Sequence, residues 1–168
     1  MKINLSEPYK FTLPVYKDQR GYLIEFSKKD HFIKNQKLNY EIYTLSTGKV
    51  FRGLHFQLPP KDQNKLLILK TGKIKDYVIN LRKGKNFGKK KIFNLIEGDC
   101  LWIPKGFAHG FKTLSNNTVL TYKMSSKFNE KLYRSLSYKS VGIKIDKYKI
   151  SKKDSSTSLK LKDIIGIF

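Results

Sequence analysis

The stretch that decides the fold of this chain is Lys49-Val50-Phe51-Arg52-Gly53-Leu54-His55-Phe56-Gln57-Leu58-Pro59-Pro60. Its apolar residues are typical of a β-strand that enters a core, whereas Arg52, His55 and Gln57 are polar residues that a core normally excludes. Conflicts of this kind between pattern and surroundings are expected at functional sites. A second stretch, Gly98-Asp99-Cys100-Leu101-Trp102-Ile103-Pro104-Lys105-Gly106-Phe107-Ala108-His109-Gly110-Phe111, has the same character. We therefore expect the two histidine-bearing stretches to line one pocket.

Around these stretches the chain shows many short apolar runs separated by turn signals. We expect strands at 11–16 (interrupted at Pro14), 22–26, 40–46, 65–70, 73–82, 92–96, 100–103, 110–114 and 119–124. The turn dipeptide Thr71-Gly72 predicts that the strands on its two sides form a hairpin. Regularly spaced short strands without a long segment of helical period predict an all-β sandwich or barrel.

The length of 168 residues indicates a single domain, residues 1–168, because domains are on the order of 100–200 residues long. The barrel is expected at about residues 8–128. From Asn129 onward the periodicity fades, so residues 129–168 are predicted to be an irregular surface extension with a short closing helix near Leu159–Phe168. The polar segment 28–37 is predicted to be a loop or a short helix, with His31 solvated.

The formal charge of +22 favours anionic partners. The lysines of the chain, however, are spread along its whole length and do not gather in one segment. We therefore do not predict binding to nucleic acid. The single cysteine, Cys100, excludes an intrachain disulfide and lies in an apolar run, as a buried thiol would. With no signal-peptide pattern near Met1 and no apolar run of about 18 residues, we expect no membrane partner and a cytoplasmic location.

Strand alternation places His55 and Gln57 on one face together with Phe51 and Gly53. Arg52 then points the other way, unless Gly53 forms a bulge that re-aims it.

The spacing Gly98-x5-Pro104-x-Gly106-x2-His109 resembles the second motif of cupins, which are small double-stranded β-helix barrels. The first cupin motif supplies two histidines and a glutamate, where this chain has His55, Gln57 and Asp62. A metal held by His55, Asp62 and His109 is one alternative, since three nitrogen or oxygen ligands suffice for an open site. The amide at position 57 and the loop position of Asp62 favour the other, a cupin barrel with no metal and no cofactor.

Acid–base chemistry is what such a pocket can perform. An imidazole group in general titrates near neutrality, so His55 suits a general base, while Tyr122 can donate a proton from a late strand. Lys65 can neutralise a developing oxyanion, and Arg52 and Arg20 can bind phosphate oxygens in a bidentate manner. This set predicts proton abstraction next to a carbonyl group on a phosphate-bearing substrate.

Several motifs together resemble the dTDP-4-dehydrorhamnose 3,5-epimerase family. They are Asp18-x-Arg20-Gly21-x3-Glu25, Arg52-Gly53-Leu54-His55-Phe56-Gln57-x-Pro59-Pro60-x2-Gln63-x-Lys65, Asp76-x3-Asn80-Leu81-Arg82, Phe87-Gly88 and Leu101-x-Ile103-Pro104-x-Gly106-Phe107-Ala108-His109-Gly110-Phe111. The resemblance extends from about residue 8 to residue 128.

The resemblance implies a cupin-like jelly roll, a homodimer without metal, and a nucleotide-diphospho-4-keto sugar as substrate. In these terms His55 abstracts the proton α to the C4 ketone, Lys65 stabilises the enolate oxygen and Tyr122 reprotonates from the opposite face. Arg52, and Arg20 from the partner subunit, are expected to hold the diphosphate. His109 is expected to be a supporting or phosphate-side residue, and the further substrate contacts expected are Gln57, Glu25 and Asn80.

Departures from the family pattern shape the expected substrate. The aspartate that normally orients the catalytic histidine is expected in the segment Ser137–Ile143, where this chain has Tyr138. Asn80 replaces a usual aspartate, and Phe128 replaces a usual second tyrosine. These departures resemble epimerases of capsular heptose synthesis, which favours GDP-4-keto-heptose over dTDP-4-keto-6-deoxyhexose and leaves open whether C3, C5 or both are inverted.

Two other readings are kept as alternatives. A sugar-nucleotide 3,4-ketoisomerase carries Arg-Gly-x-His-x-His, but Gln57 replaces its second histidine. A barrel that binds a nucleotide sugar without turnover is suggested by the missing aspartate.

Overall fold

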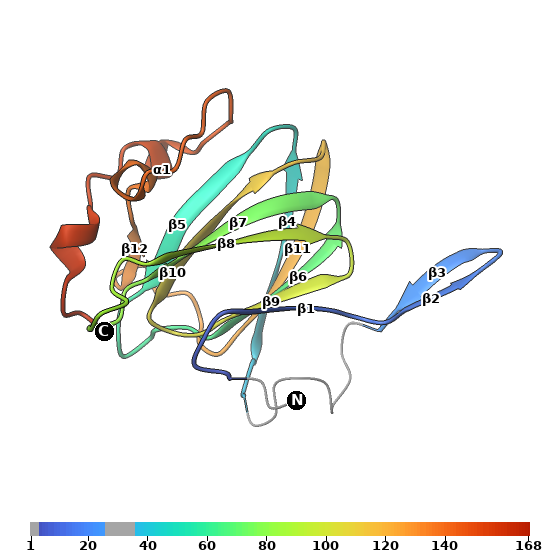
Figure 1. The fold of residues 1–168 in the computed structure, drawn as a ribbon, viewed down its shortest axis with the longest axis horizontal. Coiled ribbons are helices and arrows are strands. Elements are labelled where there is room, and N and C mark those ends of the chain that lie inside the picture. Colours follow the sequence, from blue (N-terminus) through green and yellow to red (C-terminus); the bar gives the residue numbers. More distant parts are fainter. Residues whose placement is uncertain (1–3, 26–35) are drawn as a thin grey trace.

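The structure is a computed structural model that describes residues 4–25 and 36–168, so His31 and most of segment 28–37 lie outside the described residues (Figure 1). The strands are β1 (Tyr9–Thr12), β2 (Val15–Asp18), β3 (Gly21–Ile24), β4 (Tyr40–Thr47), β5 (Phe51–Gln57), β6 (Lys65–Thr71), β7 (Lys73–Asn80), β8 (Lys90–Ile96), β9 (Asp99–Ile103), β10 (Phe107–Thr113), β11 (Asn117–Met124) and β12 (Tyr133–Ser135). The short helices are the 3₁₀ helix η1 (Tyr138–Val141), α1 (Lys152–Ser155) and the 3₁₀ helix η2 (Leu161–Ile164).

Two five-stranded sheets form the body of the molecule. One has the strand order β1-β9-β6-β11-β4, and the other β12-β5-β10-β7-β8. Side chains of both sheets meet in one cluster, which includes Leu67, Leu101 and Leu120 from the first sheet and Val78 and Phe111 from the second. Antiparallel strands that bury one face in a shared core give the all-β, cupin-like jelly roll that the sequence predicts.

Strands β6 and β7 do not form the predicted hairpin. They belong to different sheets, so the Thr71-Gly72 turn carries the chain from one sheet to the other. Gly72 has φ +94°, and a Cβ there would lie 2.5 Å from Oγ of Ser115 and 2.6 Å from the carbonyl oxygen of Asn117. A turn dipeptide shows where the chain reverses, but not which strands pair afterwards.

Residues 129–168 form an irregular extension on the outside of the barrel, but part of it is packed against the barrel rather than solvated. Strand β12 pairs with β5, and Leu136, Ile143 and Ile164 are buried. They belong to a second apolar cluster with Phe51 and Phe56, on the face of β5 that points away from the first core. Figure 1 shows this extension packed along the β12–β5 edge of the body. The predicted closing helix corresponds to η2.

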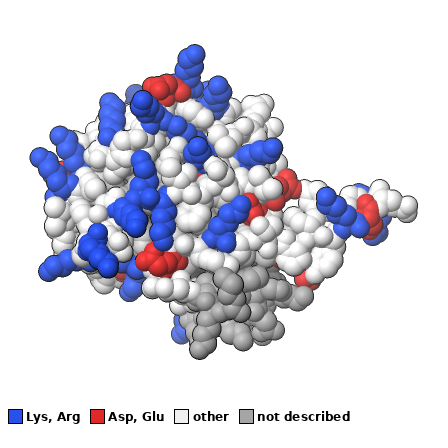
Figure 2. All heavy atoms as spheres, in the orientation of Figure 1, with Lys and Arg blue, Asp and Glu red and all other residues white. Residues whose placement is uncertain are grey.

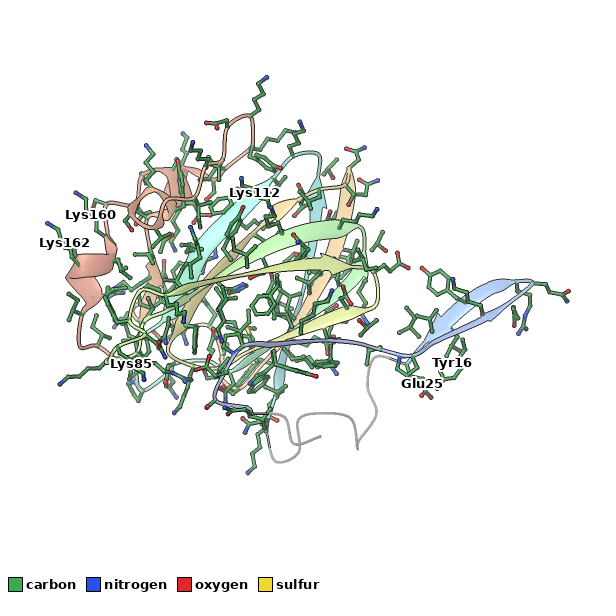
Figure 3. All side chains as sticks on the ribbon, viewed as in Figure 1. Tyr16, Glu25, Lys85, Lys112, Lys160 and Lys162 are labelled. Atoms are coloured by element: carbon green, nitrogen blue, oxygen red, sulfur yellow. The ribbon has the colours of Figure 1, made fainter. Side chains whose placement is uncertain are left out.

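Strands β2 and β3 form a separate hairpin that projects from the body, as Figures 1 and 3 show. The break after β1 falls at the predicted Pro14. Tyr16 and Leu23 on this hairpin have exposed fractions of 54% and 59%.

Basic side chains are distributed over the face in Figure 2 with few acidic ones between them. In Figure 3, Lys160 and Lys162 lie close together on the C-terminal extension, whereas Lys85 and Lys112 lie elsewhere on the surface. Cys100 is a buried free thiol, as predicted. Within the described residues, no helix has the length and apolar character that crossing a membrane requires.

Candidate active site

A cavity of about 370 Å³ opens between the two sheets. Its lining combines cationic, phenolic and imidazole groups with an apolar wall: Ile42, Thr44, Arg52, His55, Gln63, Lys65, His109, Phe111, Tyr122, Met124, Phe128 and Tyr133. Both histidine-bearing stretches therefore line one cavity, as the sequence predicts. His55 and His109 are direct cross-strand partners on β5 and β10.

A bulge in β5 brings Arg52 into this cavity. The pairing of β5 with β10 shifts register between His55 and Arg52, beside Gly53. Gly53 has φ +131°, and a Cβ there would lie 2.5 Å from the Cα of Gly110. The conditional prediction of a bulge at Gly53 is thus confirmed. Phe51, expected on the face of His55, packs instead in the second apolar cluster because the bulge reverses the alternation.

The imidazole of His55 is held by a carboxylate that the sequence analysis did not find. Nε2 of His55 lies 2.7 Å from Oδ1 of Asp154, in helix α1 of the C-terminal extension. The amide of Gly53 donates to Oδ2 of Asp154 at 3.3 Å. The predicted loss of the orienting aspartate is therefore wrong. Tyr138, where that aspartate was sought, packs edge-on against Phe51 with ring centroids 5.4 Å apart.

A local signal for Asp154 does exist in the sequence. Ser151 precedes it by three positions, and Oγ of Ser151 accepts a hydrogen bond from the amide of Asp154 at 3.1 Å. A serine followed three residues later by an acidic residue is a helix-start pattern. This pattern fixes α1, but only the tertiary fold brings α1 to His55.

Burial acts to raise the pKa of Asp154, but its interactions with His55, Gly53 and Ser135 outweigh burial and lower that pKa. The carboxyl is therefore ionised at neutral pH. An ionised carboxylate at Nε2 holds the proton of the neutral imidazole on that nitrogen, which leaves the lone pair on Nδ1. The pair thus has the arrangement of an oriented general base.

His109 lies on the floor of the cavity beside a buried carboxyl group. Its Nδ1 is 3.4 Å from Oδ2 of Asp76 on β7, and both residues are buried. Burial, with Lys65 and His55 nearby, lowers the pKa of His109 well below its usual value, and burial raises the pKa of Asp76. His109 is thus neutral near pH 7 and supports the site rather than carrying charge. The sequence analysis places Asp76 at the start of a family motif but assigns it no role in the site.

Lys65 and Tyr122 come from the sheet that faces His55. Lys65 on β6 pairs with Met124, two residues beyond Tyr122 on β11, so the two side chains are diagonal neighbours. Burial lowers the pKa of Lys65 to about 8, although Asp76 acts in the opposite direction. Burial, and then Asp76, raise the pKa of Tyr122, so its phenol keeps its proton. The ring of Tyr122 lies 5.7 Å from that of His109.

A smaller cavity of about 310 Å³ adjoins the first. Arg52, His55 and Tyr133 line both, and Lys149 and Lys153 from the C-terminal extension line the smaller one. The guanidinium of Arg52 donates from Nε to Oγ of Ser46 at 3.0 Å and from Nη2 to the carbonyl oxygen of Leu45 at 3.1 Å. Three cationic side chains that line one hollow are suited to bind an anion.

Tyr133 is a further cavity residue that the sequence analysis missed. Its ring lies 5.2 Å from that of His55 and 5.3 Å from that of Phe128. Nζ of Lys153 lies 4.1 Å from the Tyr133 ring centroid, within the range of a cation–π contact. These contacts set Tyr133 at the partition between the two cavities.

Two predicted substrate contacts, Gln57 and Asn80, line neither of the two cavities. Gln57 is buried, its Nε2 donates to the carbonyl oxygens of Lys61 and Lys127, and its Oε1 accepts from the amide of Asn129. Gln57 follows His55 by two residues on β5, but these hydrogen bonds tie its side chain to the loops after β5 and β11, and it does not line the cavity. Oδ1 of Asn80 accepts a hydrogen bond from the backbone amide of Arg82 at 2.9 Å, which closes the turn after β7.

Arg20 and Glu25 are not brought to the cavity within one chain. Both line a hollow on the β2–β3 hairpin, where Nη2 of Arg20 pairs with Oδ2 of Asp18 at 2.6 Å. Figure 3 shows Tyr16 and Glu25 at the base of this projecting hairpin. Of the predicted site residues, the cavity therefore gathers His55, Tyr122, Lys65, Arg52 and His109.

The alternative metal site at His55, Asp62 and His109 is not assembled. Oδ2 of Asp62 lies 3.8 Å from Nζ of Lys105. Across residues 4–25 and 36–168, no group of three or more His, Cys, Asp or Glu side chains is placed to hold a metal ion.

The family model of dTDP-4-dehydrorhamnose 3,5-epimerase matches residues 2–162 of this sequence. The chain belongs to that family. An epimerase of this name from Sinorhizobium fredii is 36% identical over 168 residues, which covers 92% of this chain and 83% of the relative. The enzyme from Shigella flexneri is 31% identical over 87% of this chain and 84% of its own length.

Solved structures of the same family share the fold. An epimerase from Legionella pneumophila, in complex with dTDP-4-keto-L-rhamnose, is 25% identical with a TM-score of 0.85, covering 96% of this chain and 90% of its own. One from Bacillus anthracis, with TDP and pyrophosphate bound, is 27% identical with a TM-score of 0.81, covering 95% and 97%. The chain is therefore an isomerase, a nucleotide-sugar epimerase with a cupin-like barrel.

Proposed function

We propose that this epimerase inverts C3, C5 or both in a nucleoside-diphospho-4-keto sugar, with His55 as base and Tyr122 as acid. The observation that carries the proposal is that these two groups lie on opposite walls of one cavity. His55 comes from the β5 sheet and Tyr122 from the β11 sheet. Inversion at a carbon requires a proton to leave one face and another to arrive at the opposite face.

The reaction begins with proton abstraction next to the C4 ketone. The C–H bond breaks, its proton moves to Nδ1 of His55, and its electron pair forms the C=C bond of an enolate. The charge that develops on the ketone oxygen is stabilised by the buried ammonium of Lys65, which a low-dielectric site makes effective. Asp154 stabilises the imidazolium that forms.

Reprotonation completes the inversion. The phenol of Tyr122 gives its proton to the opposite face of the carbon, and the ketone is restored. Solvent then reprotonates the phenolate and takes the proton from His55. The raised pKa of Tyr122 supports its role as the acid, because the donor must be protonated when the enolate forms.

We assign the diphosphate to the smaller cavity, because Arg52 lines both cavities and can link the two parts of the substrate. Lys149 and Lys153 supply further charge there. Two departures from the family pattern, Asn80 and Phe128, still favour GDP-4-keto-heptose as the sugar. The third departure, a missing aspartate beside His55, no longer counts because Asp154 occupies that place. The relatives with bound dTDP sugars make dTDP-4-keto-6-deoxyhexose our first candidate, and GDP-4-keto-heptose the second, for surface or capsular polysaccharide synthesis in the cytoplasm.

Turnover of both candidates by the wild-type protein tests this proposal. We expect NMR to detect a changed configuration at C3, C5 or both in at least one of them. If neither sugar changes at either carbon, under conditions in which binding is saturated, the proposed reaction is wrong.

A homodimer is part of the proposal, with Arg20 acting in the partner's cavity. The hairpin that carries Arg20 projects from its own body, and the Arg20 side chain is 85% exposed. Strand β4, at the sheet edge beside the cavity, also exposes Tyr43 and Leu45. A hairpin of one subunit laid against β4 of the other would cover both apolar surfaces.

Mixing two defective variants tests this arrangement. In a mixture of Arg20→Ala and His55→Asn, random pairing leaves about a quarter of all sites with both wild-type residues if Arg20 acts across the dimer. We expect activity to return towards that fraction after the subunits exchange. A mixture that stays as inactive as its components, while native mass spectrometry shows the mixed dimer, would show that Arg20 does not act across the interface.

A further inference from the structure

Strand β12 places a serine directly opposite the catalytic histidine. In the antiparallel pairing of β12 with β5, Ser135 is the cross-strand partner of His55. The hydroxyl Oγ of Ser135 donates to Oδ1 of Asp154 at 3.2 Å. This is the same carboxylate oxygen that Nε2 of His55 approaches. One oxygen atom therefore receives both the imidazole and the hydroxyl.

The Ser135 hydroxyl is in a position to act on the carboxylate and not on the substrate. Ser135 is 8% exposed and is absent from the linings of both cavities. The side chain of Asp154 is 6% exposed, so its charge depends on donors supplied by the protein. Those donors are the Gly53 amide at Oδ2, and Ser135 and His55 at Oδ1.

Ser135 is also connected to the chain segment that follows Asp154. Oγ1 of Thr157 donates to the carbonyl oxygen of Ser135 at 2.6 Å, and the amide of Ser137 donates to the carbonyl oxygen of Leu159 at 2.8 Å. The segment that delivers Asp154 is thus bonded to β12 just beyond the helix. The register of β12 on β5 consequently fixes where the carboxylate stands relative to His55.

We propose that Ser135 is a positioning residue for the epimerase reaction, which holds the Asp154 carboxylate in register with His55. This inference rests on the proposed function, in which His55 is the base. The hydroxyl removes one rotational freedom of the carboxylate and shares its charge, so that Oδ1 stays aligned with Nε2 of His55 as the imidazole gains its proton.

Removing the hydroxyl with Ser135→Ala tests the inference. We expect kcat to fall about tenfold with KM unchanged, since a hydrogen bond to a charged group is lost and no substrate contact is lost. Ser135→Thr, which keeps a hydroxyl, is expected to restore most of the rate. Ser140→Ala is the matched control, because Oγ of Ser140 donates only to the carbonyl oxygen of Ser137, at 2.7 Å.

A double-mutant cycle separates positioning from a general structural role. In the Asp154→Asn background, Ser135→Ala is expected to cause no further loss of kcat, because the group it acts through has changed. A full tenfold loss in that background would overturn the inference, as would an unchanged kcat in the single variant while the wild type turns over.

A titration that needs no turnover keeps the inference testable if the proposed function fails. The carboxyl ¹³C signal of Asp154 is expected to titrate at a higher pH in Ser135→Ala than in the wild type, and at the wild-type value in Ser135→Thr. An unchanged titration in Ser135→Ala would overturn the inference. Absence of substrate turnover in the wild type, with the shift present, would overturn only the proposed reaction.

Discussion

Nε2 of His55 lies 2.7 Å from Oδ1 of Asp154, although 99 positions separate the two residues along the chain. The histidine lies on strand β5 of the β12-β5-β10-β7-β8 sheet. The carboxylate lies on the four-residue helix α1 in the C-terminal extension. The extension therefore supplies part of the candidate active site. Its apolar residues, such as Leu136 and Ile164, pack on the barrel and hold the carboxylate in place.

Replacing the proposed acid by Tyr122→Phe separates the two halves of the reaction. Proton abstraction by His55 remains possible, but no phenol delivers a proton to the opposite face. We expect formation of the epimer to fall on the order of 10²- to 10⁴-fold, whereas deuterium from solvent still enters the substrate with retention. Mass spectrometry and NMR of the recovered sugar measure the two outcomes.

Tyr148→Phe is the control for that variant, because it removes a phenol outside the two cavities and keeps the ring that lies 5.1 Å from Nζ of Lys112. Its activity is expected to equal that of the wild type. Equal rates of inversion in Tyr122→Phe and wild type would mean that another group is the acid.

The pH dependence of turnover is predicted from Lys65. Its pKa is lowered from 10.5 to about 8, so the ammonium that we propose stabilises the enolate is lost as the pH rises through that value. Activity is expected to decline above pH 8. Steady-state rates from pH 6 to pH 10 measure the decline, and the exposed residue variant Lys73→Met is expected to show the same profile.

The same shift has the opposite sign for stability. Between the folded pKa of Lys65 and its ordinary value of 10.5, the folded chain binds fewer protons at this residue than the unfolded chain does. The contribution of Lys65 to the free energy of unfolding therefore rises with pH in this window.

Turnover that stays constant up to pH 10, in protein that circular dichroism shows to be folded, would contradict the catalytic role assigned to Lys65.

Much of the site follows from the sequence because its residues lie within compact motifs. His55, Arg52 and Lys65 share one continuous motif. His109 is a polar residue within the second apolar stretch, from Gly98 to Phe111. Strand alternation and motif spacing therefore indicate a common cavity. Gln57 and Asn80 lie in the same motifs but support turns and loops, a distinction that depends on which backbone groups surround them.

The rest depends on contacts between distant segments. Asp154 lies in a Lys- and Ser-rich segment without apolar periodicity, and only its packing on β5 reveals its role. Strands β6 and β7 separate into two sheets because strand pairing is decided by long-range contacts and not by the turn between them.

Substitution of Gly53 is expected to damage both the fold and the site. In Gly53→Ala, the new Cβ would lie 2.5 Å from the Cα of Gly110, in a backbone conformation that L-residues rarely adopt. We expect the free energy of unfolding to fall by about 3 kcal/mol or more, from clash and backbone strain together. Urea unfolding followed by fluorescence measures this loss.

Gly84→Ala is the matched control for the clash. Gly84 has φ +122°, close to that of Gly53, but a Cβ there meets nothing within 4 Å. The backbone strain is similar, so we expect a loss of about 1–2 kcal/mol. If both variants lose the same free energy, the close approach of β5 to β10 does not constrain position 53.

The most direct test of the account is the rate at which deuterium from solvent enters C3 and C5 of a 4-keto nucleotide sugar, compared between wild type and Asp154→Asn. The exposed Asp146→Asn in the same extension is the control. We predict that Asp154→Asn exchanges on the order of 10²- to 10⁴-fold more slowly, since an amide neither fixes the imidazole tautomer nor stabilises its charge. Asp146→Asn is predicted to exchange at the wild-type rate. Exchange at the wild-type rate in Asp154→Asn would contradict the claim that His55, oriented by Asp154, is the base.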